Sequence, residues 1–321
     1  MSPMLLDVEV YRGGGRALWE GTPLYGQGFP ELPFTYPPFA AVIFMPLAAL
    51  PEPFASILWT FGTVAALYLC MFLFLRDHRH AAAATAVGLL TEPVWENLTF
   101  GQINVYLAAL VLVDALLPHR FRGALIGLAA AIKLTPAIFV LVLRKHDIAR
   151  AAAAFVGATG LGCLFAPEDS RRYWLEVVHE TSRIGGLGYV SNQSWRGFLE
   201  RIDAPQWWLV AVVFTLALAA LRHKSVLLVG VVGLLCSPVS WSHHFVWYVF
   251  IAVWFTSQAR WAWAAAAWAV VLARMHWWVP NDNDLEYTWE WWQHLPGNAY
   301  LWWGLILVAF GARRVPHALR Q

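Results

Sequence analysis

Apolar stretches of membrane-spanning length, separated by short polar motifs, limit the fold of this chain more than any other feature. The apolar runs lie near residues 39–50, 54–75, 81–96, 103–117, 123–143, 149–166, 206–221, 225–238, 243–257, 261–274 and 299–312. A membrane helix needs about 20 predominantly apolar residues, so several runs must be extended by their flanks, tilted or broken. The pattern predicts an all-α, polytopic bundle of about 10–11 membrane helices over residues 54–321, preceded by a loop with membrane-surface helices over residues 1–53. We expect these two parts to form a single domain.

Composition agrees with a membrane protein and excludes some other classes. Charged residues make up 13% of the chain, far below the roughly 25% of a soluble domain, and the mean hydropathy is +0.53. The formal net charge is only +2, so we expect no nucleic-acid partner. Cys70, Cys163 and Cys236 show no Cys-x-x-Cys spacing, and we interpret them as small core residues rather than a disulfide framework or a zinc site.

Basic residues orient the bundle, because short cytoplasmic loops are enriched in lysine and arginine. Short connections contain Arg76, Arg79, Arg120, Arg122, Arg144, Lys145, Arg150, Arg222, Lys224, Arg260, Arg313 and Arg314. The other connections hold the polar motifs, which we therefore place on the extracytoplasmic face of a cell-membrane protein that crosses the bilayer several times.

Residues 123–143 have basic clusters at both ends, which a single crossing would put on opposite sides. Pro136 removes a helix hydrogen bond, and Lys133 is costly at membrane depth. We interpret the segment as two short helices that form a re-entrant hairpin. The alternative is one kinked helix with Lys133 extended to the interface.

Only six residues precede Asp7. Carrying Asp7 to the outer face would normally need an upstream helix. We therefore expect the natural gene product to have an additional N-terminal span.

The polar motifs hold groups that could act as a base or form hydrogen bonds with a polar substrate. Asp7 could act as a general base on an acceptor hydroxyl, or it could be a helix cap or a solvated loop carboxylate. The amides of Gln102, Asn104, Asn192 and Gln193 could bind sugar hydroxyls, although capping of helix ends is at least an equal alternative.

His243 and His244 follow a proline-containing stretch and, on a helix, cannot share a face. One could contact a donor phosphate or a sugar hydroxyl, or serve as an interfacial histidine. The pair lacks a third metal ligand at suitable spacing. Glu92 and Glu96 could touch an acceptor or mark the interface.

The late loop from residue 276 to 292 combines acidic and aromatic residues. It could bind the acceptor glycan, although an interfacial aromatic belt is more common. Asp282 and Asp284 lack the pattern of a calcium loop. We therefore predict no metal site.

Seven polar strings occur in the order typical of one enzyme family. They are Asp-Val-Glu-Val-Tyr at 7–11, Leu-Tyr at 24–25, Phe-Thr-Tyr-Pro-Pro-Phe at 34–39, Gly-Gln-Ile-Asn at 101–104, Ile-Lys-Leu-Thr-Pro at 132–136, Ser-Asn-Gln-Ser at 191–194 and Ser-Pro-Val-Ser-Trp-Ser-His-His at 237–244. In this order they resemble glycosyltransferase family 87, polytopic enzymes of the GT-C fold, and in particular the actinobacterial polyprenyl-phosphate-mannose-dependent α-(1→2)-mannosyltransferases. Each string alone is weak, and the ordered set is specific.

The resemblance implies an inverting transfer of mannose from polyprenyl phosphate mannose to a lipid-linked or cell-envelope glycan, with no cofactor. It implies that Asp7 is the catalytic base. Lys133 and Arg196 are our candidates for stabilising the departing phosphate, and Tyr11 and Tyr36 are further substrate-binding candidates within the matched strings.

Two alternatives stay open at this point. A related enzyme could use polyprenyl phosphate arabinose, since nothing in the motifs distinguishes the two sugars. A transporter or flippase for lipid-linked sugars could also bury polar groups, but it should show paired interrupted helices in two related halves. We find one such break, at residues 133–136.

Overall fold

Helices account for every named element of the computed structural model, which describes residues 5–26, 32–180, 183, 185–221 and 225–311. In that part of the chain, extended pairing is limited to one isolated bridge between Asn192 and Trp241. The predicted all-α fold is confirmed, and the protein is a polytopic membrane protein. Four of the basic residues used to orient it, Arg222, Lys224, Arg313 and Arg314, lie outside the described residues.

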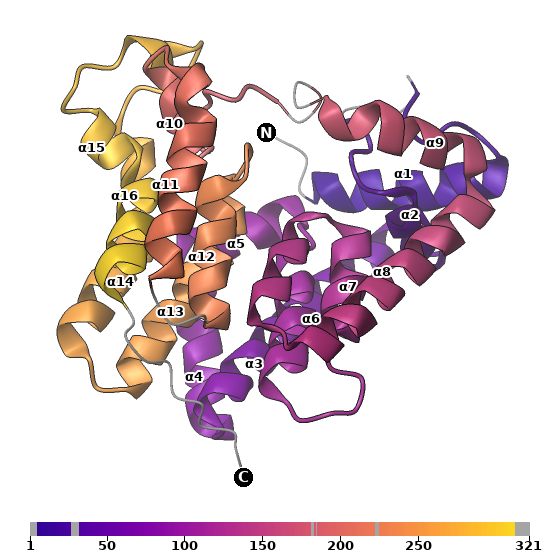
Figure 1. Ribbon diagram of the computed structural model, residues 1–321, viewed down its shortest axis with the longest axis horizontal. Coiled ribbons are helices and arrows are strands. Elements are labelled where there is room, and N and C mark those ends of the chain that lie inside the picture. The colour runs from indigo at the N-terminus through magenta and orange to yellow at the C-terminus, as the bar shows by residue number, and fades with distance from the viewer. Residues whose placement is uncertain (1–4, 27–31, 181–182, 184, 222–224, 312–321) are drawn as a thin grey trace. The chain divides into compact units, whose positions relative to one another are not determined.

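The chain packs into two compact units (Figure 1). The first unit comprises Met1–Leu67 and Asn97–Ile184, and the second comprises Tyr68–Glu96 and Gly185–Gln321. Two helices, α3 (Glu52–Leu75) and α5 (Glu92–Phe100), contribute residues to both. The prediction of a single integral-membrane domain stays a prediction.

The first unit carries the amino-terminal helices. Its other elements are α1 (Leu6–Glu20), α2 (Pro38–Ala48), α6 (Asn104–Leu116), α7 (Ala124–Ile132), the 3-10 helix η1 (Thr135–Val142), α8 (Lys145–Phe165), α9 (Pro167–Leu175) and η2 (Val177–His179). Helix α1 packs along α2, and α7 packs against α8 (Figure 1).

The second unit contains the carboxy-terminal half of the chain. Its elements are α4 (His78–Gly88), α10 (Trp195–Arg201), η4 (Pro205–Trp207), α11 (Trp208–Ala220), α12 (Val226–Cys236), η5 (Ser242–His244), α13 (Val246–Ser257), α14 (Trp261–Ala273), η6 (Met275–Trp278), η7 (Leu285–Thr288), α15 (His294–Gly297), α16 (Ala299–Ile306) and the π-helical turn η8 (Leu307–Gly311). Helix α13 is almost entirely buried and packs against α14 and α12.

Two helices, α3 and α8, are by themselves long and apolar enough to cross a membrane. The pair α5 and α6 is bent by 117° and would make a third span if the two helices cross together rather than form a re-entrant loop. Shorter apolar helices of 10–17 residues include α2, α12, α13 and α14. These lengths agree with the expectation that several runs are short or broken, and the number of crossings stays a prediction.

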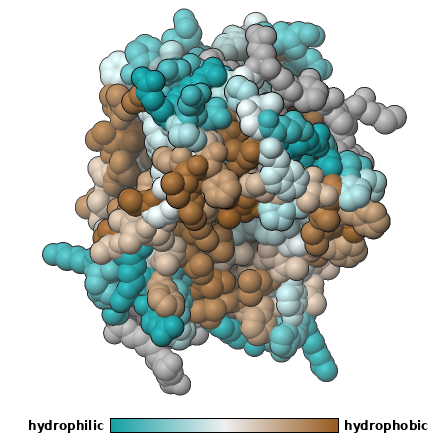
Figure 2. Space-filling model, turned by 90° about the vertical axis from the view of Figure 1, so that its right-hand side faces the viewer, coloured by the Kyte–Doolittle hydropathy of each residue, from teal (hydrophilic) through white to brown (hydrophobic). Residues whose placement is uncertain are grey.

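The two long helices expose many apolar side chains. Helix α8 exposes Val156, Leu161, Leu164 and Phe165, and α3 exposes Phe54, Ile57, Leu58 and Phe61. Figure 2 shows a face on which hydrophobic side chains fill the middle, with hydrophilic residues above and below. Such apolar surface belongs in lipid rather than in water.

The segment 123–143 is divided at the predicted place. Helix α7 ends at Ile132, Lys133 adopts an extended conformation with φ −147° and ψ 130°, and the 3-10 helix η1 begins at Thr135. The break is consistent with Pro136, which lies at the start of η1. A continuous helix would need an N–H at position 136 to bond to the carbonyl of Ile132, and proline lacks this donor and clashes with that carbonyl. The prediction of two short helices is confirmed, and the path of this segment through the membrane stays a prediction.

Candidate active site

The Gly101-Gln102 turn lies against the amino-terminal end of α1. The N–H of Leu5 donates to the carbonyl oxygen of Thr99 at 2.8 Å. Gly101 has φ +74°, and a Cβ there would lie 2.5 Å from Cγ2 of Val8. Glycine is therefore required twice, for the left-handed backbone and for the close approach. This contact brings Gln102 beside Asp7, 95 positions away in the sequence.

Asp7 lies in the first turn of α1 and is 9% exposed. Gln102 donates a side-chain hydrogen bond to its carboxylate, and the ammonium group of Lys133 is the nearby cation. The backbone of Gln102 is held by Asn97, whose Nδ2 donates to the Gln102 carbonyl at 3.0 Å and whose carbonyl accepts from the Gln102 N–H at 2.8 Å. The turn thus presents its amide in a defined position.

Burial raises the pKa of the Asp7 carboxyl from its ordinary value to about 6, although the hydrogen bond from Gln102 and the charge of Lys133 both lower it. Desolvation disfavours the charged form and here outweighs the two stabilising contacts. A carboxyl with this pKa is mostly ionised at neutral pH and is a stronger base than an exposed aspartate. Its proton affinity suits general base catalysis near pH 7.

Lys133 reaches the same site from the break after α7. Its Nζ donates to Oδ1 of Asn104 at 3.1 Å and lies 5.6 Å from the centre of the Tyr36 ring. Asn104 is the first residue of α6. The string Gly101–Asn104 therefore contributes one amide to the carboxylate and another to the ammonium group.

Tyr11 and Tyr36 complete this cluster in the first unit. The two hydroxyl groups are 3.1 Å apart, and the Tyr36 hydroxyl donates to Oε1 of Gln102 over a long 3.5 Å. Tyr11 is fully buried and Tyr36 is 7% exposed. The structure thus brings together six of the residues predicted from the sequence, which are Asp7, Tyr11, Tyr36, Gln102, Asn104 and Lys133.

Asn192 and Gln193 lie in the second unit, where their side chains bind backbone groups. Asn192 donates to the carbonyls of Leu187 and Pro238, and its Oδ1 accepts from the N–H of Ser240. Both side chains have no exposed surface. The Asn192 side chain thus binds loop backbone rather than a helix end, and a sugar-binding role for these amides stays a prediction.

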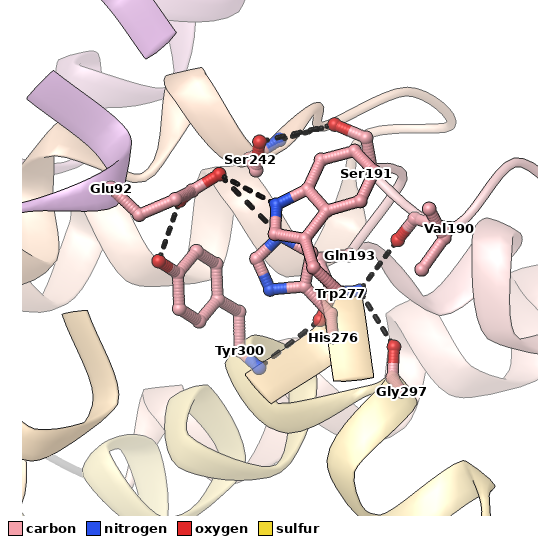
Figure 3. Close-up of polar contacts among 9 residues, drawn as sticks. All are labelled: Glu92, Val190, Ser191, Gln193, Ser242, His276, Trp277, Gly297 and Tyr300. Atoms are coloured by element: carbon pink, nitrogen blue, oxygen red, sulfur yellow. Dashed lines mark hydrogen bonds and ion pairs between the residues drawn. The ribbon is translucent and has the colours of Figure 1, made fainter. Parts of the chain in front are cut away.

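Gln193 belongs to a network around Glu92 (Figure 3). Its Nε2 donates to the carbonyls of Val190 and Gly297, and its Oε1 accepts from the N–H of Tyr300. The hydroxyl of Tyr300 donates to Oε2 of Glu92 at 2.7 Å. This network joins helix α5 to the Ser191–Ser194 motif and to α16.

His276 and Trp277 supply the other contacts of Glu92. Oε1 of Glu92 lies 3.4 Å from both Nε2 of His276 and Nε1 of Trp277. Glu92 and His276 have no exposed surface. Glu92 therefore packs in the interior of the second unit.

The remaining predicted residues have mixed surroundings. His243 is 7% exposed, and the ring of His244 lies perpendicular to it with Nδ1 accepting from the N–H of Trp241 at 3.1 Å. The two imidazole rings are in edge-to-face contact, with their centres 4.7 Å apart. Arg196 forms an ion pair with Glu200 on the same helix at 2.6 Å. The substrate-binding roles of these residues stay predictions.

The late aromatic loop divides into a core residue and exposed rings. Trp289 packs with Val190 and Val279, and its Nε1 donates to the carbonyl of Pro280. Trp278, Trp291 and Trp292 are more than half exposed. Within the described residues, no three His, Cys, Asp or Glu side chains converge as a metal ion would require.

Sequence reasoning missed His276, Tyr300 and Arg201 as buried polar residues. Arg201 is 3% exposed, with hydrogen bonds to the carbonyls of Gly188, Tyr189 and Asn192. Tyr300 stands inside an apolar run that carries no polar signal. Arg201 lies near the Ser191–Ser194 motif and His276 begins the late loop, so these two residues gave a weak polar signal in the sequence.

A buried carboxylate, an amide and an ammonium group in a helical membrane protein are suited to a polar substrate. The chain belongs to glycosyltransferase family 87, whose sequence model matches residues 34–238. It is therefore a membrane glycosyltransferase, as the ordered motifs indicate. The family match begins after Asp7.

Curated mycobacterial proteins are similar over most of the chain. A polyprenol-phosphate-mannose-dependent α-(1-2)-phosphatidylinositol mannoside mannosyltransferase of Mycolicibacterium smegmatis is 35% identical over 95% of this chain and 83% of its own length. The protein of the same name from Mycobacterium tuberculosis is 36% identical over 96% of this chain and 84% of its own length. A phosphatidylinositol pentamannoside mannosyltransferase of M. smegmatis is 37% identical over 78% of this chain and 68% of its own length. No solved structure matches the chain significantly.

Proposed function

We propose that this protein transfers mannose, with inversion, from polyprenyl phosphate mannose to a phosphatidylinositol mannoside and forms an α-(1→2) linkage. The donor and the acceptor class are those in the names of the similar mycobacterial enzymes. The observation that carries the mechanism is the buried Asp7 carboxylate between Gln102 and Lys133. These three residues come from separate parts of the sequence, and all belong to the first unit.

The reaction requires one proton transfer and one substitution. The acceptor hydroxyl attacks the anomeric carbon of a β-linked mannosyl phosphate, and its proton passes to Asp7. The bond from the anomeric carbon to the phosphate oxygen breaks, and its electron pair leaves with the polyprenyl phosphate. The new glycosidic bond is α, and no covalent sugar–enzyme intermediate forms.

Lys133 is suited to the second half of this reaction. Its ammonium group is a preorganised cation held by Asn104, and negative charge develops on the departing phosphate. A cation placed before the reaction stabilises that charge without reorganisation at the moment of bond cleavage. Asp7 and Lys133 thus serve the attacking and leaving groups respectively.

The donor is tested by transfer of radiolabelled sugar in membranes that contain the protein. With phosphatidylinositol mannoside present, labelled polyprenyl phosphate mannose should give a labelled lipid that an α-(1→2)-specific mannosidase degrades. Membranes without the protein are the control. Transfer only from polyprenyl phosphate arabinose, or no transfer by correctly inserted protein, would contradict the proposal.

We propose that the site faces the outer side of the cell membrane, because the basic connections orient the bundle. A matched pair of cysteine variants tests this, made after Cys70, Cys163 and Cys236 have been replaced. Glu20→Cys, at the end of α1, should react with a membrane-impermeant maleimide in intact cells. Arg120→Cys, in a basic connection, should react only after the cells are broken. The opposite pattern would place Asp7 on the cytoplasmic face.

A further inference from the structure

Four hydrogen bonds connect the backbone at Ile103 to the carboxylate of Asp7. The N–H of Ile103 donates to the Tyr11 hydroxyl oxygen at 3.2 Å, and the Tyr11 and Tyr36 hydroxyl groups are 3.1 Å apart. The Tyr36 hydroxyl lies 3.5 Å from Oε1 of Gln102, and Gln102 binds Asp7. Every member of this chain of contacts is at most 9% exposed.

The direction of each bond follows from the chemistry of its two ends. The Oε1 of Gln102 can only accept, so the proton of Tyr36 points to it. The contact between the tyrosines must then use the proton of Tyr11, whose oxygen is free to accept from Ile103. Nε2 of Gln102 remains to donate to Asp7. All four bonds therefore donate toward the carboxylate.

A series of hydrogen bonds that all donate in one direction has two effects on Asp7, the final acceptor. Successive hydrogen bonds polarise one another, so donation to Asp7 is stronger than from an isolated amide. The chain also selects one of the two orientations of the Gln102 amide. Turned over, that amide would present Oε1 to the carboxylate and would repel its charged form.

We infer that Tyr11 and Tyr36 are positioning residues that act through Gln102 to keep Asp7 ionised and oriented as the base. This rests on the proposed function and replaces, for both tyrosines, the substrate contacts predicted from the sequence. Their burial agrees with the inference, since neither hydroxyl needs to reach a sugar. The Tyr11 ring stacks on Phe44 with centres 4.4 Å apart and lies beside Trp59, and the Tyr36 ring packs edge-on against Phe44.

The pH dependence of transfer tests this inference. In the wild type, kcat/KM should fall as the pH drops below about 6, because a protonated Asp7 cannot accept the acceptor proton. In Tyr36→Phe the acid limb should move to higher pH by roughly one unit, giving about tenfold lower activity at pH 5 and little change at pH 8. A structural or substrate-binding role would lower activity at every pH without moving the limb.

Two further variants sharpen the result. Tyr11→Phe should shift the limb in the same direction by less, and the double variant should shift it no further than Tyr36→Phe alone, because both changes break one chain. Tyr173→Phe removes the hydroxyl of another buried tyrosine in the first unit and should leave the limb unmoved. Additive shifts, or an unmoved limb in Tyr36→Phe, would overturn the inference.

A measurement independent of transfer separates the inference from the proposed function. Dicyclohexylcarbodiimide modifies protonated, buried carboxyl groups, and mass spectrometry of the α1 peptide reports its rate at Asp7. Tyr36→Phe should extend this modification to higher pH by the same interval as the acid limb. If the modification rate at Asp7 had the same pH dependence in wild type and variant, the inference that the tyrosines act through Gln102 would be overturned, even if transfer depends on Asp7. Modification that shifts while transfer survives Asp7→Asn would instead overturn the proposed mechanism.

Discussion

Asp7→Asn should lower kcat/KM for mannose transfer by about 10²–10⁴-fold, the usual contribution of a positioned general base. Asparagine has nearly the same size and can still contact Gln102, but it cannot take the acceptor proton. The measurement is the initial rate of labelled mannose transfer at pH 8, where the wild-type carboxylate is ionised. The amount of inserted protein should be equal in both membranes.

Glu20→Gln is the matched control for this substitution. It removes a carboxylate from the other end of the same helix, where the side chain is exposed, and it should leave transfer unchanged. If transfer survives Asp7→Asn, the protein is still a glycosyltransferase, but Asp7 is not its catalytic base. Equal losses in both variants would indicate a general effect on α1.

Lys133→Gln should lower kcat by roughly 10²–10³-fold, the size of effect found when one preorganised stabilising group is lost. Glutamine can still bind Asn104, so the break after α7 should persist. The loss should appear mainly in kcat, because the charge on the departing phosphate is greatest in the transition state. Steady-state kinetics with varied donor concentration separate kcat from KM.

The control for Lys133 is Lys145→Gln at the exposed start of α8, which should not change transfer. A rise in KM with unchanged kcat would assign Lys133 to donor binding alone. Because Lys133 also stabilises the ionised Asp7, Lys133→Gln should in addition move the acid limb upward. A kcat loss without that movement would contradict the described proximity of the two side chains.

The membrane class, the all-α fold and the break at Lys133 could be predicted from the sequence because each depends on local physics. Apolar composition sets the preference for lipid, and Pro136 removes a helix hydrogen bond and so disfavours a continuous helix. The placement of Asp7, Gln102 and Lys133 on one face was predicted from the basic connections and the break at Lys133, and the role of Asp7 from the resemblance of the ordered motifs to one family. The structure agrees, with Gly101 as the residue that permits the contact with α1.

Contacts between distant residues could not be predicted in this way. Gln102 and Gln193 have the same side chain but different partners. Gln102 binds the Asp7 carboxylate, whereas Gln193 binds backbone groups of Val190, Gly297 and Tyr300. Glu92 is paired with Tyr300 across 208 positions. Hydropathy and motif order carry no information about such partners.

The sequence by itself thus determined that the protein lies in lipid, that its fold is all-α, that a helix breaks at Lys133, and which chemical groups are available. Only the tertiary structure decided which of those groups meet, which side chains serve backbone groups, and in which direction the bonds toward Asp7 run. The physical reason is that helix formation and lipid preference depend on neighbouring residues, whereas a hydrogen bond depends on angles and distances of a few ångströms. Those are set only when helices far apart in the sequence pack together.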